Sequence, residues 1–161
     1  MKLRILGLTV FAALMAGTVH AQEYTVDKDH SKVKFGVRHM RSIVEGQFKE
    51  FEGSFKFDEK KPENSSGKFV AQAASISTDN QKRDDHLKSG DFIKKKKYKT
   101  LEFNVKKVSK AKAKDTYKME GDLTIHGVTK NVSFDLEYMG KDKDPWGGVR
   151  AGFVAKAKIN R

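Results

Sequence analysis

Cysteine is absent from this chain of 161 residues, and proline and tryptophan are scarce, with two and one. The absence of cysteine excludes disulfides, thiol catalysis, cysteine-ligated zinc and iron–sulfur clusters. A domain of this length can be held together by its core alone. Pro62 and Pro145 both fall in segments typical of loops.

The common catalytic and nucleotide-binding motifs are also missing: there is no HExxH, GxSxG, GxxxxGK or GxGxxG. Asp84-Asp85-His86 admits two interpretations, an acid–base pair or the exposed face of a short helix, and the second is favoured for the aspartates. Histidines are spread singly beyond residue 21, so only a metal site assembled from distant strands remains open. The four are His30, His39, His86 and His126; for His126 a turn is preferred.

Apolar side chains are few, at 37 % of the chain against 34 % charged residues. They must be used economically, as in a sheet or barrel with one residue in two facing inward. The formal net charge is +12, with a run from Lys94 to Lys97. No recognition-helix pattern accompanies this run, so we do not expect nucleic acid as a partner. We do expect a modest attraction to anionic lipid headgroups.

The first twenty-one residues resemble a secretory signal peptide. Lys2 and Arg4 precede an apolar stretch from Ile5 to Ala16, and Val19-His20-Ala21 forms a small-x-small cleavage site. A membrane anchor is disfavoured because the apolar run is too short to span a bilayer. We expect an exported, mature domain over residues 22–161.

Strands are predicted by strict alternation of apolar and polar residues. The clearest case is residues 117–138, a hairpin around His126-Gly127 whose loop of two or four residues places Met119 and Phe134 on one face. Residues 40–45 are expected to be a connection, a bulge is expected near Lys49-Glu50, and the facing of residues 68–77 stays unassigned. The other expected strands begin near Tyr24 and cover 32–39, 48–57, 100–108 and 149–159.

Residues 78–90 are predicted to form the single short helix, with Arg83, His86 and Leu87 on one face. No segment suits the long helix of a βαβ unit. About eight strands joined mostly by short turns favour an all-β, antiparallel up-and-down barrel with the helix near its mouth. A two-sheet sandwich is the alternative fold.

A cavity for one ligand is favoured by small residues in the predicted strands, such as Ala71, Gly121 and Ala155. Three polar residues are candidates for the mouth of the barrel: His39, Arg83 and His86. The predicted ligand-binding lining consists of Phe35, Val37, Phe48, Phe51, Phe55, Leu101, Phe103, Met119, Leu123, Phe134, Leu136 and Phe153.

Several motifs together resemble the YceI-like family along the whole mature chain. They include the run GDLTIHGVTKNV from Gly121, the segment Arg83-Asp84-x-His86-Leu87-Lys88-Ser89-x-Asp91-Phe92, and the terminal Ile159-Asn160-Arg161. The resemblance implies a lipocalin-like barrel in the periplasm that holds a long isoprenoid, such as a polyprenyl phosphate or a quinone tail, with no catalytic activity and no cofactor other than such a lipid. Two alternatives are an enzyme that processes a lipid headgroup at His39, Arg83 and His86, and a binding module for other amphiphiles or anionic membranes.

Two departures from the family pattern stand out. Lys99 replaces a usual proline, and Lys94 to Lys97 replace acidic residues. Family members generally continue beyond the Asn-Arg motif into a further strand, whereas this sequence stops at Arg161. The resemblance therefore predicts a fragment, an edge completed by a partner such as a second copy in a homodimer, or an open tunnel.

Overall fold

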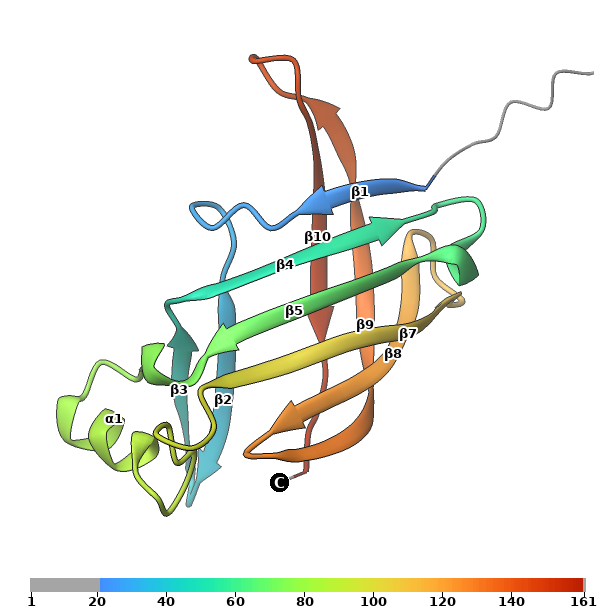
Figure 1. The fold of residues 1–161 in the computed structure, drawn as a ribbon. Coiled ribbons are helices and arrows are strands. Elements are labelled where there is room, and N and C mark those ends of the chain that lie inside the picture. Colours follow the sequence, from blue (N-terminus) through green and yellow to red (C-terminus); the bar gives the residue numbers. More distant parts are fainter. Residues whose placement is uncertain (1–20, 161) are drawn as a thin grey trace, which may run out of the picture.

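The computed structural model describes residues 21–160, so the predicted signal peptide, apart from Ala21, lies outside the described residues (Figure 1). In the described part no helix is long and apolar enough to cross a membrane. The elements are β1 (Gln22–Thr25), β2 (Val33–His39), β3 (Ser42–Phe48), β4 (Phe51–Phe57), η1 (Pro62–Asn64), β5 (Ser66–Gln72), η2 (Ala73–Ser75), β6 (Ile76–Ser77), α1 (Gln81–Lys88), β7 (Thr100–Lys110), β8 (Thr116–Ile125), β9 (Val128–Lys143) and β10 (Val149–Lys156).

Seven strands pair in the order β1-β4-β5-β7-β8-β9-β10, and a second sheet has the order β2-β3-β6. The second sheet continues the first, because β1 leads to β2, β3 to β4 and β5 to β6. At the bend, the Lys49 N–H donates to the Ser75 carbonyl (3.1 Å) and the Gln72 N–H to the Glu50 carbonyl (2.9 Å). The result is a nearly closed antiparallel barrel with one short helix, which confirms the predicted fold class (Figure 1).

The expected connection at residues 40–45 is wrong, because β3 begins at Ser42 and pairs with β2. The hairpin turns at Met40, whose φ is 52°. Alternation is hard to see in β3 because an inward position is Gly46, where a Cβ would lie 2.4 Å from Cζ of Phe35. The irregularity expected at Lys49-Glu50 is present as the break between β3 and β4.

Residues 68–77 are not one strand, which explains why their facing could not be assigned. β5 ends at Gln72, the 3-10 turn η2 follows, and β6 starts at Ile76. The turn resets the alternation that a continuous strand would keep. Ala73 within the turn is completely buried, and Ile76 is buried against Phe48.

The hairpin of β8 and β9 has the two-residue loop, since Ile125 pairs with Val128. Both loop residues have positive φ, 54° at His126 and 75° at Gly127. Glycine suits the second position for a further reason, because a Cβ there would lie 2.4 Å from the Tyr98 ring. Met119 pairs with Phe134, so the two residues share one face, as both predicted registers required.

Candidate functional site

The inward faces of the strands carry a continuous set of apolar side chains. Cross-strand pairs such as Phe103 with Leu123 and Phe153 with Tyr138 fix which residues share this face. All twelve predicted lining residues belong to it. Their inward facing follows the predicted strand parity, and Phe48, Phe55, Phe103, Met119 and Leu136 are buried in packed clusters. That any of the twelve contacts a ligand stays a prediction.

One end of the barrel is filled with aromatic rings. The Phe57 ring lies 5.3 Å from Tyr117, 5.1 Å from Tyr138 and 5.2 Å from Phe153, measured between centroids. Burial, and then the negative charge of Glu59, raise the pKa of the Tyr138 hydroxyl to about 12. The interior at this end is therefore filled by packed aromatic side chains.

Several inward side chains nearer α1 are only partly covered. Phe51, Leu101, Leu123 and Phe134 are half-buried. On β2 the inward Val37 is 57 % exposed. The α1 side of this end is partly covered, because Leu87 and Ile93 pack against the small cluster around Phe48. Among the described residues, the apolar interior is thus most open between β2 and the β8–β9 hairpin.

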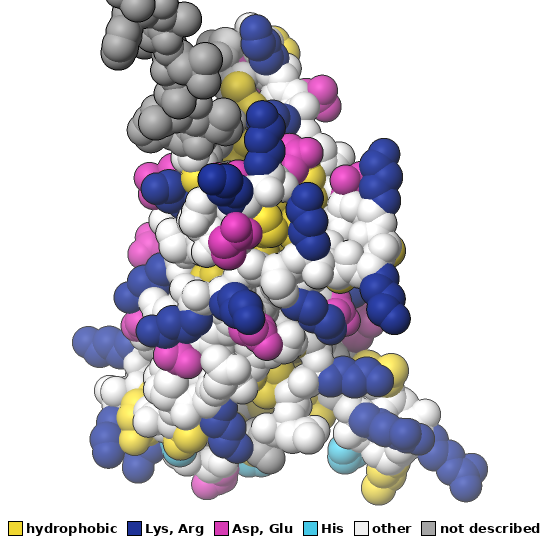
Figure 2. All heavy atoms as spheres, turned by 90° about the vertical axis from the view of Figure 1, so that its right-hand side faces the viewer, with side chains coloured by type: hydrophobic (Ala, Val, Ile, Leu, Met, Phe, Trp, Pro, Cys, Tyr) yellow, Lys and Arg dark blue, Asp and Glu magenta, His cyan; other side chains and the backbone are white. Residues whose placement is uncertain are grey.

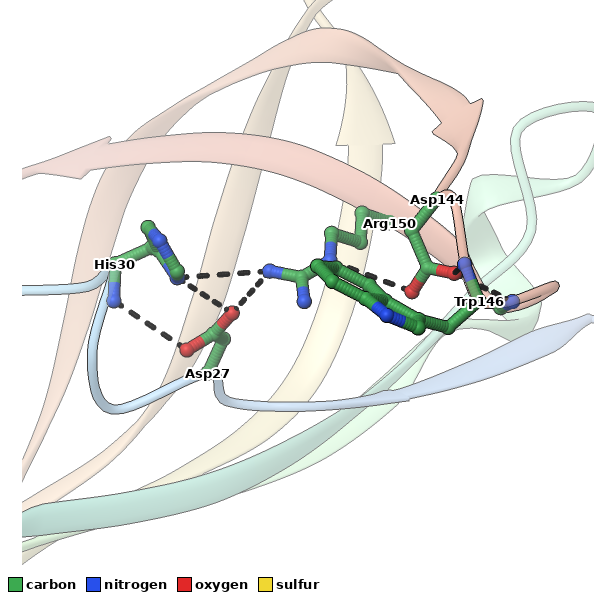
Figure 3. A network of polar contacts seen from close by, with 6 residues as sticks. Asp27, His30, Asp144, Trp146 and Arg150 are labelled. Atoms are coloured by element: carbon green, nitrogen blue, oxygen red, sulfur yellow. Dashed lines mark hydrogen bonds and ion pairs between the residues drawn. The ribbon is translucent and has the colours of Figure 1, made fainter.

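Side chains rather than a backbone ladder join the two edges of the long sheet, β1 and β10. The Tyr24 and Phe153 rings are 6.0 Å apart. Just beyond β1, a polar clasp lies around Arg150 (Figure 3), which donates to the Asp27 carboxylate at 2.5 Å and to Asp144 at 3.4 Å. His30 Nδ1 lies 2.9 Å from the same Asp27 carboxylate. The clasp links segments 123 positions apart in the chain.

Both carboxyl groups of the clasp are stabilised in their charged form. A hydrogen bond with the His30 side chain is the main cause that lowers the pKa of Asp27. The backbone N–H of Gly148 has the largest part in lowering the pKa of Asp144, followed after desolvation by that of Trp146. Asp144 therefore orders the β9–β10 turn and faces Arg150 at the same time (Figure 3).

The three polar residues predicted at the mouth are not brought together: no hydrogen bond, ion pair or ring contact is found between any two of them. Arg83 donates from Nε to Thr78 Oγ1 (2.8 Å) and from Nη2 to the Thr78 carbonyl (2.9 Å). His86 Nε2 lies 3.4 Å from the Asp91 carboxylate. His39 ends the inward row of β2, as predicted, and is exposed.

The contacts of Asp84 and Asp85 support a structural role in the helix rather than an acid–base pair with His86, although Asp84 is buried rather than exposed. Its carboxylate accepts from the Thr78 N–H (2.8 Å) and the Thr78 hydroxyl (2.6 Å). Burial alone would raise the pKa of Asp84, but these hydrogen bonds outweigh it and lower the pKa. Asp85 accepts from Gln81 on the exposed side of α1. These contacts fix α1 to the end of β6.

Two features at the open end were missed from the sequence. Lys130 pairs with Leu123 and so belongs to the inward face of β9. The His126 ring lies 4.7 Å from the Tyr98 ring, and its buried Nε2 has no hydrogen-bond partner in the described residues. The parity of the hairpin could have revealed Lys130, because both loop lengths leave it in the row of Val132 and Phe134.

The outer surface is mixed in charge and predominantly basic. Figure 2 shows Lys and Arg side chains over the whole of one face, with fewer acidic side chains and small hydrophobic patches between them. Residues 79–99 contain eight Lys or Arg and four Asp or Glu. Within residues 21–160 no group of three or more His, Asp or Glu side chains is placed to hold a metal ion.

Comparison with known sequences gives consistent matches along the whole barrel. Residues 24–161 match the YceI-like domain. The chain is 42 % identical over 164 residues to Protein YceI of Escherichia coli O17:K52:H18, covering 99 % of this chain and 84 % of that protein. A UPF0312 protein of Serratia proteamaculans is 40 % identical over 163 residues, with the same coverage.

Solved structures with the same fold include a YCEI protein of Campylobacter jejuni. It is 38 % identical with a TM-score of 0.66, over 83 % of this chain and 78 % of that one. BcnA of Burkholderia cenocepacia is 26 % identical with a TM-score of 0.70, over 73 % and 74 % of the two chains.

Proposed function

The chain belongs to the YceI-like family, and from this premise we propose that it binds a long isoprenoid lipid in its barrel and carries or stores it in the periplasm. The observation that supports the proposal most is the inward apolar row that stays half-buried toward α1, from Phe134 and Leu123 to the exposed Val37. A slender branched hydrocarbon chain would cover these side chains and complete the core. The predicted signal peptide supports the location.

Energetics favour a ligand recognised mainly by its chain. Each methylene removed from water contributes ~0.8 kcal/mol, whereas an exposed ion pair contributes roughly 0–1 kcal/mol. The gain from a long chain is limited by the cost of ordering both partners. Affinity should therefore rise with chain length until the half-buried row is covered.

This expectation is tested by measuring the binding of a short, a medium and a long prenyl quinone to the mature protein. Isothermal calorimetry or fluorescence displacement would report the affinity. We expect the affinity to increase with each added isoprene unit up to a plateau, with a negative heat-capacity change. Equal affinity for all three lengths would contradict binding inside the barrel, because only the chain differs between them.

A second candidate function, contact with an anionic membrane, is favoured by the lysine run and by exposed apolar residues on the β2–β3 hairpin. Met40 is 84 % exposed and Ile43 68 %. Such a surface combines electrostatic attraction with shallow insertion. It would let the barrel exchange lipid with a bilayer. The alternative of a headgroup-processing enzyme has less support, because Arg83 and His86 are engaged with Thr78 and Asp91.

A further inference from the structure

Lys130 lies at the open end of the inward apolar row of β9. Its cross-strand partner is Leu123, and the next inward residues along β9 are Val132 and Phe134. The neighbouring pair, Thr124 and Thr129, shares the opposite face, where their hydroxyls are 2.8 Å apart. Neighbours in a strand face opposite sides, so the threonines occupy the outer face and Lys130 the inner one.

Several lysines on the outer face of these strands have acidic partners, whereas Lys130 has none among the described residues. Lys118 pairs with Asp135, Lys106 with Asp122 at 3.5 Å and Lys68 with Glu102 at 3.0 Å. Within residues 21–160 no carboxylate lies within 4.0 Å of the Lys130 ammonium group. Lys130 is exposed, so its aliphatic stem can follow the apolar row while the ammonium group stays at the opening.

The position suits the polar end of an amphiphile. A chain packed along Phe134 and Val132 would end at Lys130, three residues past the β8–β9 turn. His39 ends the inward row of β2 at the same end of the barrel and also has no carboxylate partner among the described residues. The inward face is thus apolar along its length and carries groups able to donate hydrogen bonds where it opens.

We propose that Lys130 binds an anionic lipid headgroup, so that the barrel selects a polyprenyl phosphate over a neutral prenol or quinone. The inference rests on the proposed function, because it concerns the headgroup of the same lipid. A phosphate offers a charge-assisted hydrogen bond to the ammonium group, which a neutral hydroxyl or carbonyl provides only weakly.

The test compares a polyprenyl phosphate with the prenol of the same chain length on the mature protein. Wild type should bind the phosphate roughly tenfold more tightly, the ratio for one charge-assisted hydrogen bond of modest strength. Lys130→Met should remove this preference without weakening prenol binding, and Lys130→Arg should retain it. Lys107→Met is the matched control, because Lys107 is exposed and lies opposite Glu120 on the outer face of the sheet. It removes the same charge outside the barrel and should leave the preference unchanged.

The outcomes separate the two proposals. If wild type binds both lipids equally, or if Lys130→Met keeps the preference, the role of Lys130 is overturned and isoprenoid binding stands. If neither lipid binds, the proposed function is overturned and the inference with it. Added salt should weaken phosphate binding and leave prenol binding unchanged; a preference insensitive to both salt and Lys130→Met would place headgroup selection elsewhere.

Discussion

Val37 and Ile43, both on the β2–β3 hairpin, provide a direct test of which face of the sheet binds the lipid. Val37 pairs with Val44 and faces inward, whereas Ile43 pairs with Arg38 and faces outward. Their exposed fractions are similar, 57 % and 68 %. Replacing either by serine should change the free energy of unfolding by less than about 1 kcal/mol, since surface substitutions rarely do more.

The effect on binding should differ sharply between the two. Complete burial of a valine side chain contributes ~1.5–3 kcal/mol, and a ligand can cover only the part of Val37 that is still exposed. Val37→Ser should therefore cost about 1 kcal/mol of binding free energy, or roughly a fivefold weaker Kd. Ile43→Ser should leave the Kd unchanged.

The assay is a titration of both variants and wild type with one long prenyl quinone, after thermal melting has shown similar stability. The ratio of the two Kd values matters more than either value alone, because the matched variant corrects for general effects on the hairpin. An unchanged Kd for Val37→Ser, or an equal loss for Ile43→Ser, would show that the inward face of β2 does not contact the lipid.

Three further predictions concern the clasp, the bend and the surface. Because the folded-state pKa of Asp27 is lowered from 3.8, its stabilising effect is complete above that value and lost as pH falls through the lowered pKa. The hydrogen bond with His30 is the main cause of the lowering, so His30→Ala should flatten the acid side of a Tm-against-pH curve, and an identical curve would contradict this part of the clasp. Gly46→Ala should destabilise the fold by ~1–3 kcal/mol through overpacking, as measured by chemical denaturation. Gly90→Ala should be nearly neutral, because a Cβ there would have no atom within 4 Å. Equal effects of the two substitutions would refute overpacking at Gly46. Replacing Lys94 to Lys97 by glutamine should weaken sedimentation with anionic liposomes at low salt but not quinone binding in solution; unchanged sedimentation would remove the membrane proposal.

Alternation of apolar and polar residues was sufficient to predict most of the barrel. The two strands around His126 were predicted with the correct facing, because each strand keeps a strict period of two and the loop length changes register without changing parity. The lining residues follow from the same rule. The change of parity also revealed the irregularity at Lys49-Glu50, but alternation could not show that residues 68–77 bend into the other sheet at Ala73 to Ser75.

The polar residues of the site were harder to predict, for a physical reason. Spacing on a helix placed Arg83 and His86 correctly on α1, but not their partners, which come from Thr78 and Asp91. Arg150 and Asp27 lie 123 positions apart, and only the curvature of the closed sheet brings them together. Lys130 resembles an ordinary surface lysine until the register assigns it to the inner face.

Native mass spectrometry, with solvent extraction of protein gently purified from cells that express it, tests lipid binding in the barrel most directly. We predict a protein peak heavier than the polypeptide by the mass of one amphiphile, which is released by extraction and identified as an isoprenoid. Protein that carries no amphiphile, and that takes up no long prenyl quinone or polyprenyl phosphate when these are supplied, would contradict it.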